Sequence, residues 1–460
     1  MPKQLYSVGL DVGTSTTQMI LSALTVENRA SGFAVPEMEI RDRQVIYRSK
    51  VHFTPLKGDF LVDGDKIREL IAKEYEKAGI SRQQVDTGAI IITGETSRKE
   101  NAAAVLASLS EFAGDFVVAT AGPDLESVLA AMGAGAVEYS KKTGKTVVHM
   151  DIGGGTSNLA LIEDGNITKT GCLNVGGRLI KLDDSGVITY ISPVLQGLCG
   201  LWVGERPTLQ QLGEVAKLLC RALEMAAGRI ETDGLLQQLS TREAECIWQP
   251  PRFPVTVSFS GGVADCIETR CEPMAFGDIG PLLGQAISES SLCRGDHRLG
   301  EHTIRATVIG AGCHSTQLSG STVFCRNVAL PKKNLPVAVL TRQEQDDENM
   351  AQIAAQKLAQ TDSREAVLAL PGYENPDYEK ICALAEKIVS AMENRSVYVC
   401  LQGDMAKALG QRLGLMLPEG SACLCLDRLR FAGQSYLDIG QPVGPCFPVV
   451  IKTLVLSKES

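Results

Sequence analysis

One pattern occurs twice in the sequence, as VGLDVGTSTTQMIL at residues 8–21 and as VHMDIGGGTSNLAL at residues 148–161. In each copy an apolar run ends in an aspartate, a turn rich in Gly, Thr and Ser follows, and a second apolar run begins. Apolar runs bounded by turn residues predict β-strands, so each copy is a predicted hairpin. The recurrence of a whole hairpin pattern predicts a duplicated architecture.

The two turns have the composition of phosphate-binding turns. Glycine lets backbone N–H groups approach phosphate oxygens closely, and Thr and Ser hydroxyls add further donors. We therefore expect the hairpins to face each other across a cleft and to hold a polyphosphate between them. The residues expected to contact it are Gly13, Thr14, Ser15 and Thr16 on one side and Gly153, Gly154, Gly155 and Thr156 on the other.

Asp11 and Asp151 stand at the end of the first strand of each predicted hairpin. Carboxylates at these places are expected to bind a hydrated Mg2+ that bridges the phosphates, mainly through water. A third glycine pair, Gly261 and Gly262, follows the predicted strand VTVSFS at residues 255–260. These two glycines are expected to open a flat slot for adenosine.

If the bound polyphosphate is hydrolysed, a side chain must also orient the attacking water. Glu126 is the first candidate for this catalytic role, beside Asp11 and Asp151, because it lies in the first turn of a helix predicted over 124–136. Its alternative role is to complement the dipole of that helix. Glu95, in TGETSRKEN, is a second candidate for the water-positioning acid.

Other nucleotide-binding motifs fail on spacing. TGKT at 143–146 would need a glycine where Tyr139 stands, so it predicts a turn between a helix and a strand. GAG at 310–312 has Ser315 where a dinucleotide motif needs its third glycine. His149 lies inside a predicted strand and is expected to be a core residue.

The composition of the 460 residues excludes several classes of function. Acidic residues outnumber basic ones, 54 to 45, and the formal net charge of -9 disfavours a nucleic-acid partner. No window approaches the roughly 20 apolar residues of a membrane span. The 14 cysteines include no C-x-x-C pair, which favours reduced thiols in a cytoplasmic protein. The sequence leaves the choice between monomer and homo-oligomer open.

Strand and helix patterns alternate along the chain, which predicts an α/β protein of three parts. We expect a first domain over residues 1–145, a second over 146–330 with a helical insert at 178–250, and a third over 337–460 with a parallel sheet. The proline-flanked segment PKKNLP, 331–336, is the expected linker.

Three segments resemble, in order and approximate spacing, motifs of the superfamily of actin, sugar kinases and heat-shock chaperone ATPases. VGLDVGTSTTQMI at 8–20, MDIGGGTSN at 150–158 and VSFSGGVAD at 257–265 resemble its two phosphate motifs and its adenosine motif. AGPDLESVLAAMGAGA, 121–136, and RATVIGAGCHS, 305–315, resemble its two connecting helices. The resemblance implies two actin-like (ribonuclease H-like) α/β domains with ATP and Mg2+ in the cleft between them.

Within that superfamily the whole chain resembles the ethanolamine ammonia-lyase reactivating factors. The likeness is clearest in ITGETSRKENAAAVL, CLNVGGRLI and SYLDIGQPVGPCFPVVIKTLVL. It implies an ATP-dependent molecular chaperone that exchanges damaged cobalamin in ethanolamine ammonia-lyase for adenosylcobalamin. It also implies a place in the cytoplasm, in association with the ethanolamine bacterial microcompartment. A small-molecule kinase and an ATP-binding filament protein are the alternatives.

Overall fold

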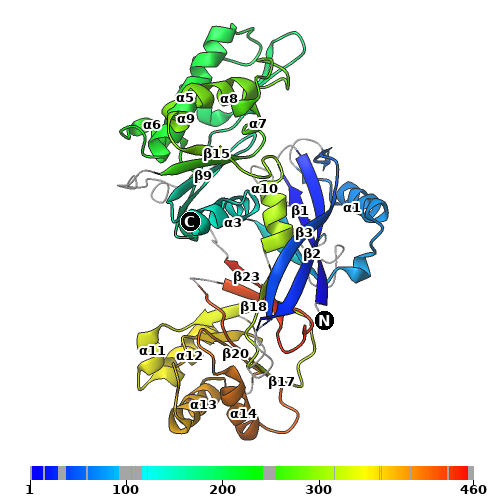
Figure 1. The fold of residues 1–460 in the computed structure, drawn as a ribbon, viewed down its shortest axis with the longest axis vertical. Coiled ribbons are helices and arrows are strands. Elements are labelled where there is room, and N and C mark those ends of the chain that lie inside the picture. The colour runs from blue at the N-terminus through cyan, green and yellow to red at the C-terminus, as the bar shows by residue number, and fades with distance from the viewer. Residues whose placement is uncertain are drawn as a thin grey trace.

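The computed structural model describes residues 3–13, 16–29, 38–57, 61–92, 105, 109, 117–121, 123–241, 255–314, 316–361, 363, 365–392, 395–431 and 435–453. These residues form three α/β units, each built on a main sheet of its own (Figure 1). The strands of each main sheet bury apolar side chains, and this burial is what holds helices against the sheets.

The first unit contains the strands β1 (Lys3–Val12), β2 (Thr16–Asn28), β3 (Met38–Arg48), β4 (His52–Phe53), β7 (Thr87–Ile92) and β8 (Val117–Ala121). Their sheet has the order β3-β2-β1-β7-β8, and β4 pairs with β2. β1 and β2 form the first predicted hairpin, while β7 and β8 run parallel to β1. The short strands β5 (Leu56–Lys57) and β6 (Leu61–Val62) pair with each other.

Helix α1 (Gly64–Ala78) covers one face of this sheet. Asp63 caps its N-terminus by accepting a hydrogen bond from the N–H of Lys66, and Gly79 caps its C-terminus in the left-handed region, with φ of 68°. Its apolar side chains Ile67 and Ile71 share one buried core with β1 and β2.

The second unit repeats this arrangement. Its main sheet is formed by β9 (Val147–Ile152), β10 (Ser157–Glu163), β11 (Asn166–Leu173), β14 (Thr256–Ser260) and β15 (His297–Leu299). The strand order is β11-β10-β9-β14-β15, with an antiparallel β9–β10 hairpin and parallel β14 and β15. This is the order of the first sheet element for element, so the predicted duplication is confirmed.

The remainder of the second unit differs in part from the prediction. It contains β12 (Ile180–Leu182), β13 (Ile188–Ile191), α5 (Leu209–Ala226), α6 (Gly234–Leu239), α7 (Asp265–Glu268), α8 (Gly280–Glu289) and α9 (Ser291–Arg294). The helices α5 and α6 fall within the predicted helical insert 178–250, but its first part is a β12–β13 hairpin. The carboxylate of Asp183 accepts hydrogen bonds from the N–H groups of Ser185 and Val187, and this local turn overrides the helical periodicity. Residues 242–250 lie outside the described residues.

Two helices connect the duplicated units: α3 (Pro123–Gly133), and α10 (Ala306–Ile309) with the π-helix η4 (Gly310–His314). They meet backbone to backbone, because a Cβ on Gly133 would lie 1.9 Å from Ala306 O and one on Gly310 would lie 2.0 Å from Leu129 O. The single helix predicted over 124–136 is divided at Gly135, with φ of 73°, and continues as α4 (Ala136–Thr143).

The C-terminal unit has an eight-stranded sheet with the order β16-β23-β22-β18-β19-β20-β21-β17. Its strands are β16 (Gln317–Leu318), β17 (Phe324–Arg326), β18 (Lys332–Val339), β19 (Val367–Leu370), β20 (Val397–Leu401), β21 (Cys423–Leu426), β22 (Ser435–Ile439) and β23 (Pro448–Thr453). Its helices are α11 (Arg342–Asp346), α12 (Met350–Ala359), α13 (Tyr378–Met392) and α14 (Ala406–Met416). The strands β18 to β21 are parallel as predicted, but the four outer strands are antiparallel to their neighbours.

The predicted linker at 331–336 is wrong, because β18 begins at Lys332. β16 and β17, which precede it, also belong to the C-terminal sheet. Leu318 and Val443 of this unit pack against Leu5 and Ile40 of the first unit. In Figure 1 the C-terminal unit lies at the opposite end of the molecule from α5 and α8.

Candidate functional site

A pocket of about 400 Å³ opens between the two duplicated hairpins. Every site residue predicted from the sequence that the structure describes lines this pocket. They are Asp11, Gly13, Thr16, Glu126, Asp151, Gly153, Gly154, Gly155, Thr156, Gly261 and Gly262. Thr14 and Ser15 lie outside the described residues, as does Glu95.

The two glycine-rich turns have the same closing hydrogen bond. The N–H of Gly13 donates to Thr16 O at 2.9 Å, and the N–H of Gly153 donates to Thr156 O at 2.9 Å. The first turn is also held from outside, because Thr54 Oγ1 donates to Gly13 O at 2.7 Å. The two hairpins are therefore closed by the same bond, and described residues of both turns line one pocket.

The second turn rests on the segment after β11. Gly177 N–H donates to Gly153 O at 3.0 Å and Arg178 N–H donates to Gly154 O at 2.6 Å. A Cβ on Gly176 would lie 2.4 Å from Gly154 O, so this close approach requires glycine. By contrast, a Cβ on Gly155 would meet no atom within 4 Å, so this position faces open space.

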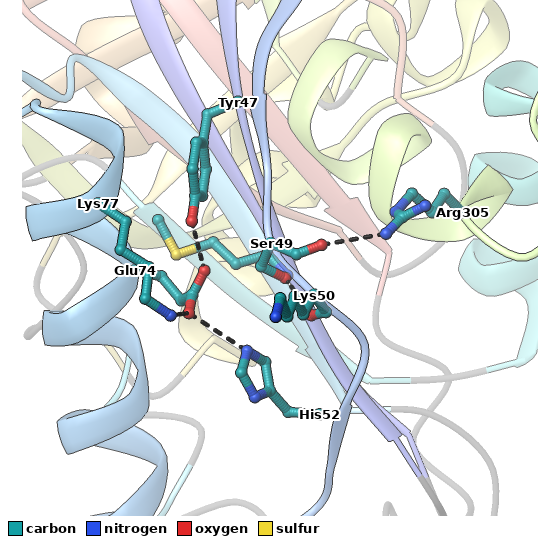
Figure 2. Close-up of polar contacts among 8 residues, drawn as sticks. Tyr47, Ser49, Lys50, His52, Glu74, Lys77 and Arg305 are labelled. Carbon is teal, nitrogen blue, oxygen red and sulfur yellow. Dashed lines mark hydrogen bonds and ion pairs between the residues drawn. The ribbon is translucent and has the colours of Figure 1, made fainter.

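A cluster of polar side chains around the buried carboxylate of Glu74 joins the strand β4 to α1 beside the first turn. His52 Nε2 lies 3.2 Å from Glu74 Oε1, and Figure 2 shows Tyr47 and Lys77 reaching the same carboxylate. Burial alone would raise the pKa of Glu74, but hydrogen bonds from Lys77 and Tyr47 lower it below its usual range. The carboxylate is therefore charged at neutral pH and anchors the strand that supports the turn.

The two aspartates have different surroundings. Asp11 is half-buried, whereas Asp151 is buried and accepts hydrogen bonds from Ser260 Oγ and, at 3.2 Å, from Thr307 Oγ1. Burial raises the pKa of Asp151, and these two hydroxyls act against that rise. Because Thr307 belongs to α10, Asp151 links the pocket directly to a connecting helix.

Two amide side chains that the sequence analysis missed complete the pocket. Gln18 pairs in register with Asp11, and Asn158 pairs in register with Asp151. Both line the pocket and are buried, and among the described residues Gln18 Oε1 and Asn158 Oδ1 find no hydrogen-bond partner. A buried unpaired amide oxygen is costly, so both atoms are suited to accept from a bound group or its water. The sequence signal was an amide seven residues after each aspartate.

The charge of the pocket is strongly negative. Among the described lining residues Arg178 is the basic one, while five are acidic: Asp11, Glu126, Asp151, Asp265 and Asp278. Arg178 Nε donates to Asp278 Oδ2 at 3.2 Å, and burial raises the pKa of Asp278. A polyphosphate in this pocket would need cations in addition to Arg178.

Lys145 and His149, which the sequence analysis did not assign to the nucleotide site, have structural contacts. Lys145, in the TGKT turn, forms an ion pair with Asp296 at 2.8 Å. His149 is fully buried, and its ring nitrogens lie 3.1 and 3.0 Å from the hydroxyls of Ser258 and Ser260. Burial lowers the pKa of His149 to about 3, so it is a neutral core residue.

Across the described ranges, no three His, Cys, Asp or Glu side chains cluster as metal ligands. In the same part of the chain no helix has the length and apolar character to cross a membrane.

Comparison with known proteins gives one family. The family model described as ethanolamine utilisation protein EutA matches residues 3–457. The chain belongs to this family. It is 37% identical to the ethanolamine ammonia-lyase reactivase EutA of Salmonella typhimurium and 36% identical to that of Escherichia coli, with 98% of both chains covered in each case. Among solved structures, ethanolamine utilization protein EutJ of Carboxydothermus hydrogenoformans is 19% identical, with a TM-score of 0.35 over 66% of this chain and 88% of that one.

The EutA family match has a structural consequence. Because it runs from residue 3 to residue 457, it includes the two duplicated units, the pocket and the C-terminal sheet. The C-terminal unit is therefore as much a part of the family as the pocket is.

Proposed function

We propose that the protein is an ATP-dependent molecular chaperone that reactivates ethanolamine ammonia-lyase by exchanging damaged cobalamin for adenosylcobalamin. The observation that carries this proposal is the likeness to two relatives named as reactivases, over 98% of each chain. The pocket between the duplicated hairpins supports the ATP-dependent part. We place this work in the cytoplasm, at the ethanolamine microcompartment.

The polyphosphate of ATP is proposed to lie between the two turns. Thr16 and Thr156 supply hydroxyl donors, and the turns supply backbone N–H groups, including those of Thr14 and Ser15. Arg178 offers its remaining guanidinium N–H groups to a phosphate while Asp278 holds its Nε. Gly261 and Gly262 are proposed to border the adenosine.

The residues present fit a hydrated Mg2+. Two carboxylates line one acidic pocket together with two amide oxygens that no described residue hydrogen-bonds, and oxygen is the ligand that Mg2+ prefers. Asp11 and Asp151 would hold the ion through water, and Gln18 Oε1 and Asn158 Oδ1 would accept hydrogen bonds from that water. When bound, Mg2+ supplies charge neutralisation to the phosphates.

Hydrolysis is proposed as phosphoryl transfer to water, in which the protein contributes positioning and electrostatics. Glu126 lines the pocket from α3 and is our candidate for orienting the attacking water. ATP and its hydrolysis products would favour different openings of the cleft and so different affinities for the lyase. The kinase alternative has no support from the relatives, since both are named reactivases.

The proposal is tested with ethanolamine ammonia-lyase blocked by cyanocobalamin. The blocked lyase is mixed with the protein, adenosylcobalamin and Mg2+, with or without ATP, and deamination of ethanolamine is followed. We expect activity to recover only when both the protein and ATP are present. Equal recovery without ATP, or no recovery with it, would overturn the proposal.

A further inference from the structure

The segment 316–322, here called the connecting segment, joins the helix pair α10–η4 to the C-terminal sheet. At its start, Thr316 Oγ1 and Thr87 Oγ1 lie 2.7 Å apart, and both residues are buried. Thr87 begins β7 in the first unit. The segment is thus fixed to the first unit before it enters the C-terminal unit.

The helix that leads into the connecting segment touches the pocket. Thr307 of α10 donates to Asp151 Oδ2, one of the two carboxylates proposed to hold the ion. The helix pair α10–η4 packs closely against β1. A Cβ on Gly9 of β1 would lie 2.4 Å from Val308 O and 2.7 Å from Gly312 N. A change at Asp151 therefore acts on an element packed tightly against both units.

The middle of the connecting segment is hydrogen-bonded into the C-terminal sheet. Ser319 N–H donates to Phe447 O at 2.9 Å, and Phe447 N–H donates back to Ser319 Oγ at 3.0 Å. Gly320 N–H donates to Asp427 O at 3.0 Å. Gln317 and Leu318 pair with β23, Ser319 is bonded to the residue before β23, and Gly320 is bonded to the residue after β21.

The far end of the segment meets two carboxylates. Thr322 Oγ1 contacts Asp404 and Asp427, which follow the parallel strands β20 and β21. A hydroxyl has one proton, so it donates to one carboxylate at a time. Arg428 Nη2 lies 3.3 Å from Asp404 Oδ2 and offsets the charge of that carboxylate. The contact ties the segment to two strands whose helices α13 and α14 form the outer layer of the unit.

We propose that the connecting segment transmits the nucleotide state of the pocket to the C-terminal unit, through Thr307, α10, η4 and the hydroxyls of Thr316, Ser319 and Thr322. This inference rests on the proposed function, in which ATP drives a change in the lyase. A contiguous chain of bonded groups can carry such coupling, and its demonstration requires a measurement at both ends.

The test uses the full chain with Ser319→Ala and Thr322→Val combined, which removes two hydroxyls and leaves the pocket intact. ATP affinity and turnover are expected to stay within two-fold of the unchanged protein, while the rate of lyase reactivation falls at least ten-fold. Thr361→Val is the matched control, because Thr361 also loses one hydroxyl bond in the C-terminal unit, to Leu358 O, but lies off the segment. It is expected to reactivate normally.

Hydrogen exchange gives a second readout that does not depend on the lyase. In the unchanged protein, Mg-ATP is expected to alter exchange in peptides covering residues 397–404 and 423–431, and this change is expected to vanish in the double variant. Thr322→Ser, which keeps the hydroxyl, should retain both reactivation and the exchange response. Protection of β19 and β20 without nucleotide reports whether the variant unit is folded.

The outcomes separate the two proposals. If the unchanged protein fails to reactivate the lyase, the proposed function falls, and the exchange response still decides whether the segment transmits. If the unchanged protein reactivates and the double variant does so equally well, or if ATP leaves exchange in the C-terminal unit unaltered, the transmission proposal is overturned.

Discussion

Asp11 and Asp151 occupy matched register positions, yet substitution of each has a different structural cost. Asp151 satisfies the hydroxyls of Ser260 and Thr307, so truncating it would leave buried donors unpaired at a cost of about 1 to 3 kcal/mol. Asp11 is half-buried, so groups beside its carboxylate stay within reach of water when it is replaced. Asp11 is therefore the cleaner residue for testing the role of the carboxylates.

We expect Asp11→Asn to lower Mg-dependent ATP hydrolysis at least ~100-fold, equivalent to about 2.7 kcal/mol in activation free energy, because a neutral amide cannot hold the hydrated cation. The melting temperature should stay within a few degrees. Steady-state phosphate release and circular dichroism measure the two effects. Turnover at the unchanged rate in a folded variant would remove Asp11 from the site.

Gly155→Val tests the second turn. A Cβ at this position would meet no described protein atom within 4 Å, so we expect the new side chain to weaken binding by contact with the ligand. We expect the Kd for Mg-ATP, measured by calorimetry, to rise at least ten-fold with no loss of stability. Gly213→Val, also open but located in α5, is the control and should bind ATP normally. Unchanged binding by both variants would place the phosphates elsewhere.

At the level of elements, the sequence predicted those helices and strands whose signals lie within short stretches of the chain. The hairpins, α1 and the parallel strands β18 to β21 were found because their apolar periodicity and caps lie within short stretches of sequence. The pairing of β16 with β23 and of β17 with β21 joins residues about 100 or more positions apart, which no local pattern reveals. Gln18 and Asn158 were missed similarly, because their importance comes from strand register across the hairpin.

The ends of β20 and β21 give a pH prediction. Burial raises the pKa of Asp427 to about 6, above the unfolded value of ~3.9. Between these values the folded state retains a proton that the unfolded state has lost, so this group makes the free energy of unfolding fall as pH rises from 4 to 6. Relative to the unchanged protein, Asp427→Asn should therefore gain about 1 to 3 kcal/mol of stability between pH 4 and pH 7.

The pKa of Asp404, which shares Thr322 with Asp427, is shifted in the opposite direction. A hydrogen bond from Thr322 is the main cause that lowers the pKa of Asp404, so its charged form contributes stability that is fully present above the unfolded pKa and is lost as pH falls through the folded pKa. Asp404→Asn should therefore be less stable than the unchanged protein by a nearly constant amount between pH 4 and pH 7. Urea unfolding of the unchanged protein and of both variants at pH 4, 5, 6 and 7 gives the free energy of unfolding of each as a function of pH. If the free energies of unfolding of the two variants changed with pH in parallel, the opposite pKa shifts of Asp404 and Asp427 would be contradicted.

At the level of the whole molecule, the C-terminal unit requires a different boundary from the one predicted at 337. We propose a division near residue 316, because β16, β17 and the first residues of β18 belong to the C-terminal sheet. A fragment 316–460 is expected to unfold in one cooperative transition. A fragment 337–460 lacks β16 and β17 and is expected to be less stable or insoluble. Equal melting temperatures would restore the earlier boundary.

The central claim is that ATP bound between the two hairpins drives release of damaged cobalamin from the lyase. Its most direct measurement is the visible absorbance of cyanocobalamin set free from the blocked lyase after separation from protein. We predict release with the unchanged protein and Mg-ATP, and release at the background rate without ATP or with Asp11→Asn. Release that is equally fast in all of these mixtures, or absent from all of them, would contradict the claim.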